Sequence, residues 1–75
     1  MSWIDHLRTH ISDLTLTEEE RLEKYNIKVE VLEESGSHYE YRITSPNCRT
    51  LERRARLTVF KNDILSFISE EQKHQ

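Results

Sequence analysis

The sequence predicts an α+β fold, in which helices pack mainly on one face of a three-stranded antiparallel sheet. Apolar residues recur at helical spacing near both ends of the chain, whereas in the middle they alternate with polar residues, and the one glycine divides that alternating segment. A chain of 75 residues with 35% apolar and 33% charged residues has enough material for one layer of core. We therefore expect residues 1–75 to form a single small domain.

The first helix is expected over about residues 2–14. Ser2 is a suitable N-cap for this helix. One stripe along the helix is formed by Trp3, Ile4, Leu7, His10, Ile11 and Leu14. A second, short helix is expected over about 17–24. Thr17 and Glu20 have the spacing of a capping box, in which each side chain bonds the backbone amide of the other residue.

Strands are expected over about 25–34 and 38–45, because both segments alternate with a period of two. Gly36 lies between them and can adopt the positive φ of a tight turn. A hairpin centred on Gly36 pairs Val31 with Tyr41, Val29 with Ile43 and Glu30 with Arg42. In this register Tyr39 and Tyr41 face the core.

Residues 48–60 allow two interpretations. As a helix, they align Cys48, Leu51, Ala55 and Val59. As a strand over about 51–60, they turn Leu51, Ala55, Leu57 and Val59 inward, turn Arg54, Arg56 and Thr58 outward, and leave Arg53 out of phase. We favour the strand, because the helix would expose Leu57 and Phe60 and the run 57–60 is rich in β-forming residues. The last helix is then expected over about 63–72, with Asp63 as its cap.

The predicted element order is similar to that of double-stranded-RNA-binding domains, which also carry a glycine and a histidine in the first hairpin, as Gly36 and His38 do here. The basic start of the last helix in those domains has no counterpart, because Lys61 is the only base in the run from Lys61 to Asp63. The sequence is therefore not assigned to that family.

Positive charge is concentrated in one part of an acidic chain. Residues 42–61 carry six bases and one acid, although the net charge of the whole chain is -3. The candidate partner-binding residues are Arg42, Arg49, Arg53, Arg54 and Arg56. Guanidinium groups bind phosphates, so nucleic-acid binding through segment 49–56 is one possible function.

Protein binding is the function that we favour. Glu30, Glu40 and Glu52 are expected on the same outer sheet face as the arginines, which makes that face mixed in charge rather than basic. Such a face can orient a charged partner, and a sheet edge can accept a partner strand or pair two copies into a homodimer. The expectation is a non-catalytic protein–protein interaction module, an adaptor or inhibitor, that uses this face and a strand edge.

No catalytic, cofactor or metal site is expected. His6, His10 and Asp13 would lie on successive turns of the first helix, but no further ligand or base accompanies them. Cys48 has no histidine near it in the sequence, and one glycine cannot build a phosphate loop. The single cysteine and the lack of an apolar run of about 20 residues predict a cytoplasmic protein without a membrane segment.

Overall fold

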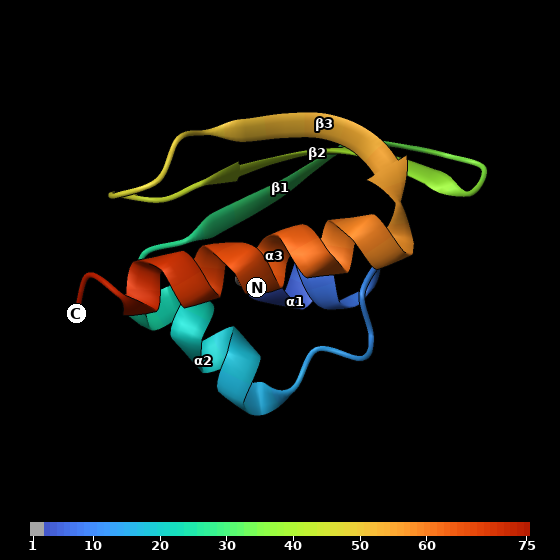
Figure 1. Ribbon diagram of the computed structural model, residues 1–75. Coiled ribbons are helices and arrows are strands. Elements are labelled where there is room, and N and C mark those ends of the chain that lie inside the picture. Colours follow the sequence, from blue (N-terminus) through green and yellow to red (C-terminus); the bar gives the residue numbers. More distant parts are fainter. Residues whose placement is uncertain (1–2) are drawn as a thin grey trace.

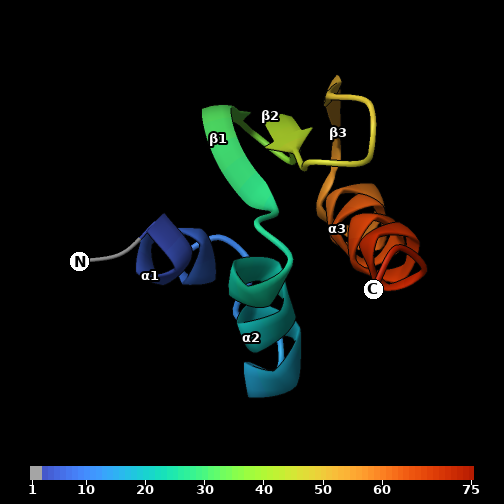
Figure 2. The same cartoon turned by 90° about the vertical axis from the view of Figure 1, so that its left-hand side faces the viewer.

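The computed structural model describes residues 3–75 and confirms the α+β fold (Figure 1). The elements follow the order α1 (Trp3–Arg8), α2 (Leu16–Lys24), β1 (Lys28–Ser35), β2 (His38–Thr44), β3 (Leu51–Arg56) and α3 (Leu57–Gln72). The strands form one antiparallel sheet in the order β1-β2-β3. All three helices lie on the same side of this sheet, so its other face is uncovered by them (Figures 1 and 2).

Helix α1 is shorter than predicted and ends at Arg8 instead of residue 14. The side chain of Arg8 donates to Glu19 of α2 at 2.7 and 2.8 Å, and the hydroxyl of Thr9 donates to the carbonyl of His6 at 2.6 Å. These bonds favour a turn at this point. Ile11 and Leu14 are nevertheless buried, in the connection to α2. The predicted cap Ser2 lies outside the described residues.

Helix α2 is capped by Thr15 rather than by Thr17. The Thr15 hydroxyl accepts from the Glu18 amide at 3.1 Å, and the Glu18 carboxylate accepts from the Thr15 amide at 2.8 Å. This is the predicted capping box, displaced by two residues. The box at Thr15 is preferred over the one at Thr17 because the helix then begins at Leu16 and buries Glu19 against α1.

The end of α2 explains why β1 starts at Lys28 and not at residue 25. Asn26 has a positive φ of 58°, and the amide of Ile27 donates to the carbonyl of Leu22 at 2.9 Å. With the Asn26 amide bonded to the Glu23 carbonyl, this is a Schellman motif. Tyr25 and Ile27 are buried as predicted, but they belong to this cap and not to the strand.

The hairpin register is confirmed for all three predicted pairs. The turn consists of Gly36, with φ of 59°, and Ser37, so that Ser35 pairs with His38. A β-bulge at Leu32 shifts the register by one residue between the turn and Val31. Tyr41 is fully buried on the core face, as predicted.

The predicted third strand is correct for residues 51–56 and wrong for residues 57–60, which form the first turn of α3. Asp63 is consequently not a cap, and the chain enters the helix at Arg56. Residues 57–60 are helical because the helix places Phe60 on the same buried face as Ile64, Phe67 and Ile68. In this helix Leu57 and Val59 are 39% and 38% exposed.

The core lies between the inner sheet face and the three helices. At its centre the ring of Tyr41 stacks on that of Phe60, with centroids 4.0 Å apart, and Tyr39 lies beside Phe60 at 5.7 Å. The buried apolar residues are Ile4, Leu7, Ile11, Leu14, Leu22, Tyr25, Ile27, Val29, Tyr41, Ile43, Phe60, Ile64, Phe67 and Ile68.

A buried carboxylate near the end of α3 holds the β2–β3 connection. Glu71 is 1% exposed, and it accepts from the side-chain and backbone nitrogens of Asn47, each at 2.8 Å. These hydrogen bonds outweigh the cost of burial and lower the pKa of Glu71 from 4.5 to about 2.

We predict that Phe60→Ala lowers the free energy of unfolding by about 3–5 kcal/mol, because a buried ring is lost from the centre of the core. Val59→Ala, in the same helical turn, is expected to cost about 0.5 kcal/mol or less, since Val59 is exposed. Urea unfolding measures both. The opposite ranking would mean that residues 57–60 continue the strand, because a strand turns Val59 inward.

We also predict that Glu71 makes stability depend on pH in the acid range. Its pKa is lower in the folded chain than in the unfolded chain, so its contribution is present above pH 4.5 and is lost as the pH falls towards 2. The gap in unfolding free energy between the native protein and Glu71→Gln is therefore expected to shrink over this interval. A gap that stays constant on acidification would contradict the assignment.

Candidate functional site

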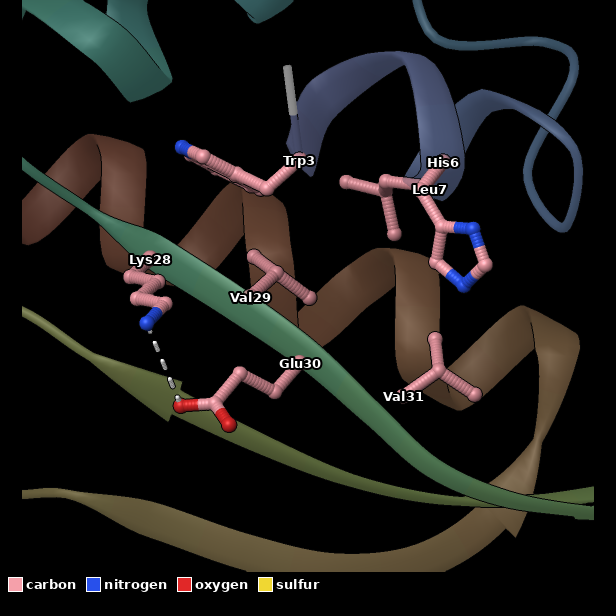
Figure 3. A pocket seen from close by; sticks show the side chains of 7 residues that line it. All are labelled: Trp3, His6, Leu7, Lys28, Val29, Glu30 and Val31. Carbon is pink, nitrogen blue, oxygen red and sulfur yellow. Dashed lines mark ion pairs between the residues drawn. The ribbon is translucent and has the colours of Figure 1, made fainter. Parts of the chain in front are cut away.

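A hollow lies between α1 and β1 (Figure 3). It is an open groove of about 580 Å³. Apolar side chains form its floor, and charged residues stand only on the strand side. It is lined by Trp3, His6 and Leu7 from α1 and by Lys28, Val29, Glu30 and Val31 from β1.

The groove exists because β1 is an edge strand. Strand β2 pairs with one side of β1, and no strand among residues 3–75 pairs with the other. Alternate backbone N–H and C=O groups of an edge strand point away from the sheet. Helix α1 lies below this free edge and extends beyond it (Figure 2).

The floor of the groove is firmly packed. Leu7 and Val29 are 2% and 4% exposed and belong to the core, whereas Trp3 and Val31 are half-buried at its border. A side chain that entered the groove would therefore meet apolar surface already ordered by the fold. Burial of such surface is the main source of free energy in most protein association.

The rim of the groove carries both signs of charge. Lys28 lies 3.9 Å from Glu30, which also lies 3.8 Å from Arg42 of β2. Glu33 is exposed and has no ion-pair partner within residues 3–75. The bulge at Leu32 separates Glu33 from the regular part of the edge, Lys28–Val31.

The five candidate arginines do not form one site. Arg42 lies on the outer sheet face, where it donates to Glu52 at 3.1 Å and meets Glu30. Arg49 is exposed in the β2–β3 connection. Arg54 and Arg56 are exposed on β3, and like Arg49 they have no ion-pair partner among residues 3–75.

Arg53 points to the helix layer, as its position out of phase implied. Its guanidinium pairs with Asp63 of α3 at 3.0 Å, and the same carboxylate accepts from the hydroxyl of Tyr41. Burial, together with the bond to Asp63, raises the pKa of Tyr41 well above its ordinary value. This cluster joins α3 to the sheet, and a partner that bound the 46% exposed Arg53 side chain would compete with Asp63 for its guanidinium.

The histidines and the cysteine form no reactive set. The rings of His6 and His10 lie side by side, with centroids 5.6 Å apart. Because α1 ends at Arg8, Asp13 does not join them and instead accepts from Lys61 at 2.7 Å. His10 pairs with Glu34 at 3.3 Å. Residues 3–75 contain no group of three His, Cys, Asp or Glu side chains that could hold a metal ion. Cys48 is a half-buried free thiol.

The sequence pointed to a strand edge as a contact surface but not to this groove. Trp3, Leu7, Val29 and Val31 were assigned to the core from their periodicity, and nothing in that periodicity shows that α1 extends past the sheet. The strand order β1-β2-β3 makes β1 an edge, and the alternating pattern of a strand does not reveal that order.

Comparisons with protein-family models, with curated proteins and with solved structures gave no match to this chain. Within residues 3–75 no helix has both the length and the apolar character needed to cross a membrane.

Proposed function

We propose that the protein is a cytoplasmic, non-catalytic protein-binding module, an adaptor or inhibitor, that receives an extended segment of another protein at the free edge of β1. The groove between α1 and β1 is the observation that carries this proposal. Addition of a strand to a sheet edge is a common mode of peptide recognition, in which backbone bonds supply affinity and side-chain pockets supply specificity.

Three features of the groove suit this mode. The edge offers backbone hydrogen-bonding groups, α1 provides an apolar floor beneath the place where a fourth strand would lie, and Lys28 and Glu30 stand at the rim. The bulge at Leu32 interrupts the regular edge of β1, which opposes continuous edge-to-edge association.

The outer sheet face provides a second contact in this proposal. Arg54 and Arg56 are exposed without ion pairs among residues 3–75, whereas Arg42 is engaged by two glutamates. A partner with acidic groups can therefore meet Arg54 and Arg56 without breaking an existing pair.

Site-specific crosslinking in cells tests the proposal. A photoreactive amino acid at Lys28, on the rim of the groove, is expected to capture a partner polypeptide. The same photoreactive amino acid in place of Glu20, which is exposed on α2 and lies outside the groove, is expected to capture no partner. Trp3→Lys places a charge on the groove floor and is expected to abolish the capture at Lys28, with circular dichroism as the check on folding. Equal capture at both positions, or capture insensitive to Trp3→Lys, would contradict the proposal.

Nucleic-acid binding is the second candidate, because Arg49, Arg54 and Arg56 are exposed and unpaired in the described chain. It predicts a complex with RNA or DNA whose affinity falls steeply with salt and is lost in the double variant Arg54→Glu, Arg56→Glu. We expect gel-shift titration at low salt to show no such complex, since Glu40 and Glu52 share the face with these arginines and the net charge is -3. A salt-dependent complex that the double variant loses would reverse the order of the two candidates.

A further inference from the structure

This inference rests on the proposed function and concerns the chemistry of the segment that binds. We infer that the bound segment adds a fourth strand to the sheet. Its outward side chains follow the order acid, base, base, and they lie alongside Lys28, Glu30 and Glu33 respectively. Its inward side chains, between these positions, are apolar. The charges of the outer face, the groove floor and the position of α1 support this inference separately.

The outer face is built from rows of side chains that run across the strands. One row consists of Glu30 on β1, Arg42 on β2 and Glu52 on β3, so that charge alternates from strand to strand. Arg42 lies 3.8 Å from Glu30 and 3.1 Å from Glu52. A base on a fourth strand opposite Glu30 continues this alternation, because opposite charges on neighbouring strands attract.

The next row towards the turn has an unrelieved repulsion. Glu33 pairs directly with Glu40 of β2, and only Arg54, on the far side of Glu40, is basic in this row. Like charges directly opposite each other destabilise a sheet. A base beside Glu33 supplies the counter-charge that this row lacks on the β1 side.

The row on the other side of Glu30, which contains Lys28, favours an acidic residue on the fourth strand. Lys28 pairs with the uncharged Thr44 of β2, and its ammonium group lies 3.9 Å from Glu30 of its own strand. An acid on the fourth strand opposite Lys28 gives this ammonium a cross-strand partner. The three rows together specify the order acid, base, base.

The inward positions follow from the floor of the groove. Side chains of a fourth strand that alternate with the charged ones point to the same side as Val29 and Val31. There they lie above Trp3 and Leu7 of α1 (Figure 3). Valine or isoleucine at these positions buries apolar surface on both the helix and the neighbouring strand.

A second copy of this chain does not satisfy the same geometry. Two copies that pair edge to edge through β1 are related by a twofold axis beside the strand. That axis brings the second α1 beneath the same pair of strands, where the first α1 already lies beyond the edge (Figure 2). A segment without a covering helix meets no such obstacle.

Short peptides test the inference by NMR. The probes are acetyl-Thr-Glu-Val-Lys-Val-Lys-Thr-amide and its reversed sequence, which covers both strand directions. The control, acetyl-Thr-Lys-Val-Glu-Val-Lys-Thr-amide, has the same composition but places the acid opposite Glu30. At about 1 mM peptide we expect one probe to shift the amide signals of Lys28–Val31, with a Kd roughly fivefold lower than that of the control.

Two protein variants sharpen the test. Glu30→Lys is expected to abolish the preference for that probe over the control, because the two peptides differ only in the residues opposite Lys28 and Glu30. Glu20→Lys, an equal change of charge on exposed α2, is expected to leave the preference intact. A preference that survives Glu30→Lys would overturn the inference.

The remaining outcomes separate the inference from the proposed function. Equal binding of probe and control, or no peptide binding while crosslinking at Lys28 still captures a partner, overturns the charge order and leaves strand addition standing. Absence of both peptide binding and crosslinking at Lys28 removes both proposals. Sedimentation that shows a dimer in which the amides of Lys28–Val31 become protected identifies a second copy as the occupant and also overturns the inference.

Discussion

The stacking of Tyr41 on Phe60 fixes α3 beneath the central strand, and the rest of the arrangement depends on it. The rings lie 4.0 Å apart, both residues are fully buried, and Asp63 of α3 accepts from the Tyr41 hydroxyl while pairing with Arg53 of β3. With the long helix held under β2 and β3, the short α1 is left to cover β1. Because α1 also extends past that strand, the β1 edge becomes a groove.

The sequence contained most of the information needed for the fold. Alternation around Gly36 gave the hairpin pairs up to Val31 correctly, because burial of one face leaves a single acceptable register. Its failures lie at boundaries, where tertiary contacts decide between two local solutions. The β-forming run 57–60 became helix because Phe60 lies on the face that α3 buries, and α1 stopped at Arg8, where the chain turns and Arg8 pairs with Glu19.

The candidate site was much less predictable than the fold. Grouping the arginines by their closeness in the sequence assumes that they have a common role. In the structure, however, Arg53 pairs with Asp63 and Arg42 pairs with two glutamates. Arg54 and Arg56 are exposed. The groove depends on where α1 lies relative to an edge, which is a property of packing between distant segments. A pattern of buried residues indicates that a helix covers a sheet, but it does not indicate how far the helix extends beyond it.

The central claim is that the edge of β1 is open in the free protein and is the surface that a partner covers. Amide hydrogen exchange along Lys28–Val31, measured by NMR on the isolated chain, tests it most directly. The account predicts alternation: amides bonded to β2 exchange slowly, while those that point into the groove exchange fast. Uniformly slow exchange of all these amides in the free monomer would show that the edge is already occupied and would contradict the account.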